Sequence, residues 1–220
     1  MKTYLLLRNE QRTELPPELQ PGDVRYPESL VEHFLREYTQ EGDAVLDPFA
    51  GFGTTLLVAE EMGRIPYGIE MDRAKAEYIR SRLKTPGGIL HGDARQLASY
   101  SLPAFDFSMT SPPYMNREDR EDPFTAYSAQ GEGYPQYLED IRRIYRQVAQ
   151  VMKEGARVVI EASNLKRTGV TPLAWDIAAV VSKELTFEGE EVGGTGAEPV
   201  RMVEDTHAAV AGDIVEQVAE

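Results

Sequence analysis

The alternation of short apolar runs with amphipathic segments is the feature that most constrains how this chain can fold. Apolar runs of strand length occupy residues 44–47, 65–70, 87–93, 104–111 and 155–162, and a sixth strand is predicted at 186–192. Between them, apolar residues recur three and four positions apart, which is the spacing of one helix face. The segments with this spacing are residues 28–38, 54–63, 73–83, 136–153 and 172–185. Alternating strands and helices predict a doubly wound α/β fold with a mostly parallel sheet.

The composition indicates one globular domain. Of the 220 residues, 41% are hydrophobic and 27% are charged, which is typical of globular proteins. The chain has no cysteine, which excludes disulfides, thiolate metal sites and a thiol nucleophile. We recognise no signal peptide and no apolar run of about 20 residues, so we expect a cytoplasmic protein without a membrane partner.

The formal net charge of −14 is unevenly distributed. Residues 115–140 contain seven acidic and two basic residues, and residues 184–220 contain ten acidic residues and one basic residue. Residues 141–183 have the opposite balance, with eight basic and three acidic residues. The acidic total argues against loose binding to polyanions, but it does not exclude a local basic face.

Acidic side chains end three successive predicted strands, at Asp47, Glu70 and Asp93. One such acid is common by chance, whereas three in succession favour a bound ligand. In parallel α/β sheets, ligands bind beyond the carboxyl ends of the strands. We therefore expect a nucleotide-like ligand at this edge.

The turn DPFAGFGTT, which begins at Asp47, narrows the choice of ligand. Gly51 and Gly53 let a ligand approach the backbone, and Glu70 lies near the spacing at which an acid holds ribose hydroxyls. Leu56 replaces the third glycine of a dinucleotide fingerprint, and no lysine follows as in a phosphate-binding loop. Asp47 would repel a diphosphate and attract a cation. These features favour an adenosine with a positively charged tail.

The segment TSPPY follows the fourth predicted strand. Two adjacent prolines cannot continue a sheet ladder, because neither nitrogen carries a hydrogen. Taken alone, the segment is typical of a strand terminator followed by a surface turn. Its position at the same edge as the three acids favours a functional site instead.

The two motifs, DPFAGFGTT and SPPY, lie about 60 residues apart. In this order they resemble the S-adenosylmethionine-dependent amino-methyltransferases of DNA, the N4-cytosine and N6-adenine group. The likeness covers roughly residues 25–190. It implies a Rossmann-like methyltransferase sheet, S-adenosyl-L-methionine as cofactor and DNA as partner. It also implies methyl transfer to an exocyclic amino group of a base, the reaction of restriction–modification methyltransferases.

The resemblance implies a role for each motif residue. Glu70 would bind the ribose hydroxyls, Asp93 would meet the adenine amino group, and the glycine turn would line the methionine end. The predicted cofactor residues are Pro27, Ser29, Asp47, Pro48, Phe49, Gly51, Gly53, Thr54, Thr55, Glu70 and Asp93. The predicted catalytic residues are Ser111, Pro112, Pro113 and Tyr114.

The chemistry explains these residue types. An exocyclic amine is a poor nucleophile, because its lone pair is delocalised into the ring. The Ser111 hydroxyl and the Pro112 carbonyl would accept hydrogen bonds from the amine. These bonds would free the nitrogen lone pair for in-line attack. Tyr114 would stack on a base taken out of its helix. In this family, a serine at the first position of the catalytic motif, here Ser111, favours cytosine N4 as the target. Asp or Asn at that position favours adenine N6.

Other polar residues carry weaker predictions. Lys166 and Arg167 follow the fifth predicted strand and are candidate contacts to DNA phosphate, with plain surface charge as the alternative. His33, His91 and His207 lack the spacing of metal ligands, so we expect no metal site.

We expect a single methyltransferase domain over residues 1–220, with its core at 25–190. Residues 115–135 are the predicted active-site loop, either a lid or a plain acidic loop. Residues 191–220 form an acidic tail in which 206–214 is a weak candidate for a final strand. No segment resembles a target-recognition domain.

Three functions therefore stay open. The favoured one is a DNA amino-methyltransferase, with cytosine N4 as the preferred target. The alternatives are an RNA base amino-methyltransferase and a non-catalytic cofactor-binding subunit. The intact acids and the intact SPPY segment argue against the last.

Overall fold

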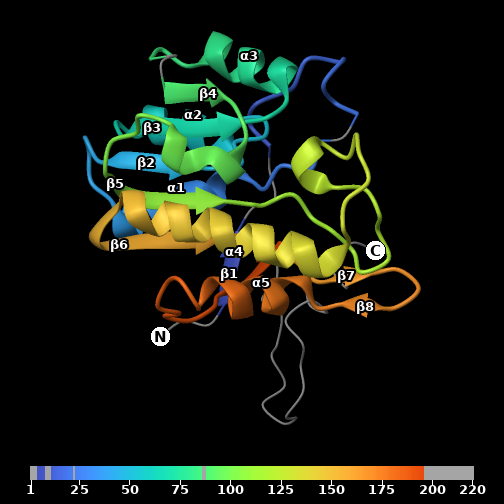
Figure 1. Cartoon of the computed structure of the whole chain (residues 1–220). Coiled ribbons are helices and arrows are strands. Elements are labelled where there is room, and N and C mark those ends of the chain that lie inside the picture. Colours follow the sequence, from blue (N-terminus) through green and yellow to red (C-terminus); the bar gives the residue numbers. More distant parts are fainter. Residues whose placement is uncertain (1–3, 8–10, 22, 86–87, 196–220) are drawn as a thin grey trace.

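A five-stranded parallel sheet forms the centre of the computed structural model, which describes residues 4–7, 11–21, 23–85 and 88–195 (Figure 1). The strands are β2 (Ala44–Asp47), β3 (Ile65–Glu70), β4 (Ile89–His91), β5 (Phe105–Thr110) and β6 (Met152–Ile160). Their order is β4-β3-β2-β5-β6, and every neighbouring pair is parallel. The chain order changes direction at β2, so a ligand crevice is expected beyond β2 and β5. The predicted doubly wound fold is confirmed.

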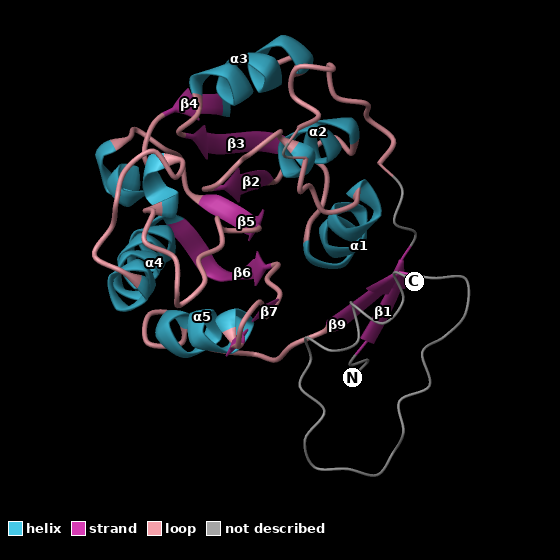
Figure 2. Ribbon diagram, turned by 90° about the vertical axis from the view of Figure 1, so that its right-hand side faces the viewer, coloured by secondary structure: helices cyan, strands magenta, loops and turns pink. Residues whose placement is uncertain are grey.

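Two layers of helices cover the sheet (Figure 2). One layer contains α1 (Glu28–Tyr38), α2 (Thr54–Glu61) and α3 (Arg73–Arg82). The other contains the 3-10 helix η2 (Ala94–Ser99), α4 (Tyr134–Val151) and α5 (Leu173–Val181). Helix α4 packs against both η2 and α5, and α1 packs against α2. All the predicted helices are therefore confirmed, with small changes at their ends.

Each face of the sheet carries its own apolar core. Leu46 faces the α4 side, where it belongs to one cluster with the fully buried Tyr145. Its neighbour Val45 faces the other side and clusters with Val31 of α1 and Phe107 of β5. Successive strand residues point to opposite faces, so central strands buried on both sides are apolar throughout. This explains why these strands appear in the sequence as continuous apolar runs.

The prediction of a sixth strand at residues 186–192 is wrong. The structure instead has β9 (Val192–Thr195), which pairs in parallel with β1 (Tyr4–Leu7) in a separate two-stranded sheet. Among the described strands, β6 pairs only with β5 and ends the central sheet. Sequence patterns cannot identify such a partner, because the pairing joins the two ends of the described chain. The candidate strand at 206–214 lies outside the described residues.

Two small elements lie at the carboxyl edge of the sheet. The 3-10 helix η3 (Pro123–Thr125) forms within the predicted loop, and strands β7 (Leu165–Lys166) and β8 (Val170–Thr171) make a hairpin after β6. In the part of the chain that the structure describes, no helix is both long and apolar enough to cross a membrane.

Gly53 provides a test of the packing beneath the glycine turn. It has φ +82°, and a Cβ there would lie 2.8 Å from Cγ1 of Ile79. Gly42 has a similar φ of +88°, but a Cβ would meet nothing within 4 Å. We expect Gly42→Ala to cost about 1 kcal/mol in unfolding free energy from backbone strain alone. Gly53→Ala should cost roughly 1–3 kcal/mol more, because Ile79 must move.

Urea denaturation of both variants measures this difference. Equal losses of stability would show that the left-handed backbone alone requires glycine at position 53.

Candidate active site

A cavity of about 2140 Å³ opens at the carboxyl edge of the sheet. It continues past the strand ends along β6 and α5, so it exceeds the size of one small ligand. Its walls include both sequence motifs. The predicted site residues that line it are Pro27, Pro48, Phe49, Gly51, Thr54, Glu70, Asp93, Ser111, Pro112, Pro113 and Tyr114. The structure thus brings the cofactor motif and the SPPY segment to one space.

Glu70 supports the glycine turn while it faces the cavity. One carboxylate oxygen accepts the Gly51 N–H at 2.7 Å, and the other accepts the Asp72 N–H at 2.7 Å. Burial raises the pKa of Glu70, and these two amide bonds oppose the rise. A carboxylate offers about four acceptor positions, so it retains capacity for hydroxyl groups of a ligand.

Asp47 does not line the cavity. It is 1% exposed and lies beneath the turn, where it accepts bonds from Thr110 Oγ1 at 2.5 Å and from the Phe49 N–H at 3.0 Å. The Tyr26 hydroxyl is 3.4 Å from its second oxygen. Burial raises the pKa of Asp47 to about 6, although the Thr110 and Phe49 bonds lower it. Asp47 thus supports the turn from beneath, and its predicted contact with a cationic ligand stays a prediction.

Three other predicted cofactor residues also lie outside the cavity lining: Ser29, Gly53 and Thr55. Gly53 caps α2 in a left-handed conformation, and the fully buried Thr55 donates to the Met109 carbonyl. Gly53 and Thr55 therefore support the turn rather than line the cavity. Pro27 precedes α1 as its N-cap and does face the cavity.

The SPPY segment is held by tyrosine hydroxyls. Tyr137 of α4 donates to the Pro113 carbonyl at 3.0 Å, and Tyr127 donates to the Tyr114 carbonyl at 2.8 Å. The Pro112 carbonyl accepts no hydrogen bond from any described residue. Pro112 itself lines the cavity.

The ring of Tyr114 is fixed at its far end. Its hydroxyl donates to Glu161 Oε2 at 3.1 Å and accepts the Ser163 N–H at 2.9 Å. Burial, followed by the negative charge of Glu161, raises the pKa of Tyr114. The hydroxyl therefore stays protonated and the ring keeps one orientation.

Glu161 and Tyr26 are site residues that the sequence interpretation missed. Glu161 follows β6 and lines the cavity, so it is a fourth acid just after a strand. The predicted strand at 155–162 extended past Glu161, so the strand-end criterion that selected Asp47, Glu70 and Asp93 did not select it. Tyr26 bridges Asp47 and Thr55 through its hydroxyl. No local pattern distinguishes that tyrosine.

The basic segment is largely neutralised by ion pairs. Arg142 and Arg146 both bind Glu184, at 2.7 and 2.9 Å, and Arg167 binds Asp119 at 2.5 Å. Arg167 and Lys166 are exposed on the β7–β8 hairpin. Among the described residues, no group of three or more His, Asp or Glu side chains is arranged to hold a metal ion.

Comparison with known proteins identifies a family model and curated relatives that match part of the chain. Residues 7–81 match a family model described as DNA methylase. Type II methyltransferase M2.DpnII of Streptococcus pneumoniae is 43% identical over 58 residues, which is 26% of this chain and 22% of that protein. Type II methyltransferase M.BamHI of Bacillus amyloliquefaciens is 46% identical over 55 residues, 25% of this chain and 12% of that protein. The chain therefore spans about a fifth or less of these relatives' length.

Solved structures share the fold. TrmN from Thermus thermophilus has a TM-score of 0.50 and 22% identity over 68% of this chain and 43% of that chain. The T. thermophilus 16S rRNA N2 G1207 methyltransferase RsmC, solved with AdoMet and guanosine, has a TM-score of 0.50 and 18% identity over 75% of this chain and 39% of that chain. At these identities the likeness shows only the Rossmann-like methyltransferase fold.

The matched segment contains α1, the glycine turn, β3 and most of α3. The match therefore agrees with the resemblance of the DPFAGFGTT turn, whereas the SPPY segment lies outside it. Over residues 7–81 the chain is therefore similar to the DNA methylase family, and over 58 residues it is similar to a Type II methyltransferase.

Proposed function

We propose that this chain binds S-adenosylmethionine and methylates an exocyclic amino group of a DNA base. One observation carries the proposal: the glycine turn and the SPPY segment open into the same cavity. A methyl donor and an amine acceptor must meet within van der Waals distance, and this cavity places both motifs where that contact is possible.

The residues at the cavity fit this cofactor. Glu70 retains acceptor capacity for the two ribose hydroxyls, and Gly51 leaves the turn backbone open to a ligand. Asp93, two residues after β4, lines the same cavity, and its carboxylate would accept the adenine amino group in competition with Arg95. When bound, the cofactor supplies an activated methyl group on a sulfonium.

The chain's own residues would prepare the amine. Ser111 and Pro112 both line the cavity, and their hydroxyl and carbonyl oxygens would serve as two acceptors for the amine. Hydrogen bonds from both amine N–H groups to these oxygens would withdraw the nitrogen lone pair from the ring. The lone pair would then point at the methyl group. The ring of Tyr114, fixed by Glu161 and Ser163, would stack on the base. A base must leave its helix to reach this pocket.

The preferred target is cytosine N4, because a serine opens the catalytic motif. The proposed contacts to backbone phosphate are Lys166 and Arg167 on the β7–β8 hairpin. Phosphate would have to compete with Asp119 for Arg167.

The direct test is methyl transfer from radiolabelled S-adenosylmethionine to pools of DNA and RNA, followed by analysis of the nucleosides. We expect label in DNA as N4-methylcytosine. Label in RNA alone would replace the proposed substrate, and cofactor binding without transfer to either pool would support a non-catalytic subunit.

Ser111→Ala tests the acceptor role of the hydroxyl. We expect cofactor affinity within about threefold of wild type and a transfer rate lower by about 100-fold, the usual cost of losing one preorganised group in the transition state. Calorimetry and the transfer assay measure the two quantities. Ser99→Ala, at the exposed end of η2, is the matched control and should change neither. A transfer rate unchanged by Ser111→Ala would contradict the proposed mechanism.

Asp47→Asn tests the buried support beneath the cofactor turn. Because burial raises the pKa of Asp47 to about 6, the folded protein binds this proton more tightly than the unfolded chain, where the pKa is about 3.9. The resulting stabilisation is complete below about pH 4 and is lost as the pH rises through about 6. The asparagine keeps the acceptor oxygen but cannot ionise. Its stability relative to wild type should therefore increase by up to about 3 kcal/mol between pH 4 and pH 7.5.

Urea denaturation across this pH range makes the measurement. Asp106→Asn is the control: bonds from Lys153 and the Ala44 N–H outweigh burial and lower the pKa of Asp106, so its stability relative to wild type should stay nearly constant above about pH 5. Parallel pH curves for wild type and Asp47→Asn would show that Asp47 does not titrate in this range.

A further inference from the structure

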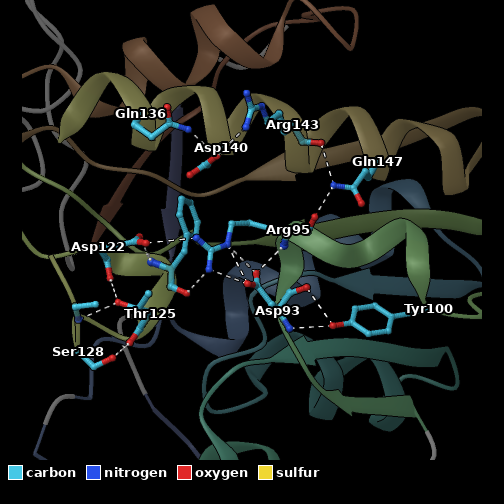
Figure 3. A network of polar contacts seen from close by, with 12 residues as sticks. Asp93, Arg95, Tyr100, Asp122, Thr125, Ser128, Gln136, Asp140, Arg143 and Gln147 are labelled. Atoms are coloured by element: carbon cyan, nitrogen blue, oxygen red, sulfur yellow. Dashed lines mark hydrogen bonds and ion pairs between the residues drawn. The ribbon is translucent and has the colours of Figure 1, made fainter. Parts of the chain in front are cut away.

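Arg95 stands between the cofactor end of the site and the loop that follows the SPPY segment. It lies in η2, directly after β4, and its guanidinium contacts Asp93 on one side and residues 122–124 on the other (Figure 3). No sequence motif singles it out.

The contact with Asp93 uses most of that carboxylate. Arg95 Nε lies 2.9 Å from Oδ2 and 3.1 Å from Oδ1, and a terminal nitrogen lies 2.8 Å from Oδ2. The Arg95 N–H also donates to Oδ1 at 2.8 Å. A carboxylate has about four acceptor positions. A further donor arriving at Asp93 would therefore compete with Arg95.

The contacts with the loop are longer. One terminal nitrogen of Arg95 lies 3.3 Å from Asp122 Oδ2, and the other lies 3.3 Å from the Phe124 carbonyl. The guanidinium also lies 5.7 Å from the centre of the Phe124 ring. Asp122 in turn caps η3 by accepting the Phe124 N–H at 2.8 Å. The hydrogen bonds of the Arg95 side chain to Asp93 are thus mostly shorter than its bonds to the loop.

The same loop touches both motifs of the proposed active site. The Phe124 ring stacks on Phe49 of the glycine turn at 6.1 Å and on Tyr137 at 5.5 Å. Two residues later, Ala126 and Tyr127 adopt positive φ values of 51° and 58°, which are unfavourable for residues with side chains. This backbone brings the Tyr127 hydroxyl to the Tyr114 carbonyl. The position of the loop therefore affects the SPPY segment.

Arg95 itself rests on a rigid support. Gln147 of α4 donates to the Arg95 carbonyl at 3.0 Å and accepts the Ala98 N–H at 2.8 Å. The backbone of η2 is fixed to α4 while the guanidinium faces two partners. Such a side chain can redistribute hydrogen bonds without moving its helix.

We propose that Arg95 is a positioning residue that couples occupancy of Asp93 to the placement of residues 121–128 over the SPPY segment. The inference rests on the proposed function, since it takes the adenine amino group as the donor that reaches Asp93. That donor occupies acceptor positions of Asp93 that Arg95 otherwise uses. The guanidinium then binds Asp122 and the Phe124 carbonyl more tightly. Because coupling between sites is reciprocal, an ordered loop also raises cofactor affinity.

Hydrogen–deuterium exchange of peptides covering residues 121–128 tests the coupling, with S-adenosylhomocysteine as the probe. In the wild type we expect exchange to slow at least threefold on saturation. In Arg95→Gln the probe should still bind, measured by calorimetry, but loop exchange should be fast and unchanged by it. Arg95→Lys should behave like the glutamine variant, because an ammonium cannot form the same divided set of bonds. Arg143→Gln, on the exposed face of α4, is the control and should behave like wild type.

Asp122→Asn provides a second route if Arg95→Gln does not fold. It leaves the Asp93–Arg95 pair intact and keeps an acceptor for the helix cap, but it removes the charge that faces Arg95. We expect the same loss of coupling. The inference would be overturned if bound probe slowed loop exchange in Arg95→Gln or Asp122→Asn as much as in wild type. It would also be overturned if bound probe left loop exchange in the wild type unchanged. Failure of the wild type to bind the probe at all would overturn the proposed function and the coupling together.

Discussion

The hydrogen bond between Thr110 and Asp47 joins the two halves of the site. Thr110 ends β5, just before Ser111, and Asp47 ends β2, just before the glycine turn. Both residues are buried, and the second oxygen of Asp47 faces Tyr26. A buried carboxylate is costly unless its acceptor positions are filled, so this bond requires both strand ends to be in register. The relative placement of the glycine turn and the SPPY segment depends on it.

The loop after the SPPY segment, residues 115–135, forms part of the cavity wall. It is not a loose acidic loop. Met115, Asn116 and Phe124 are all buried. Asp119 and Asp122 reach arginines on two different elements, Arg167 beyond β7 and Arg95 in η2. The acidic charge of this segment is therefore partly used inside the protein. The basic excess of the following segment is reduced by the same kind of pairing, so a simple charge count overstates the positive face available to a nucleic acid.

Much of the fold could be predicted because its signals are local. The parallel strands are apolar on both faces, and each helix carries one apolar stripe, so both leave a period in the sequence. The acids at strand ends and the glycine turn were equally visible. The prediction was wrong where a partner is distant in sequence: β9 pairs with β1, and no local pattern records that choice. The site prediction was incomplete for the same reason, because Glu161 and Tyr26 act through partners tens of residues away.

The order of strands and helices, the polar groups at one edge of the sheet and the resemblance to DNA amino-methyltransferases all follow from local sequence. The use of those groups depends on the tertiary structure. It placed Asp47 beneath the turn and Glu70 at the cavity, although both are acids at strand ends. It also set Arg95 between Asp93 and the loop after the SPPY segment. The physical reason is that residue type and spacing specify which atoms can bond, whereas burial and long-range packing specify which of them do.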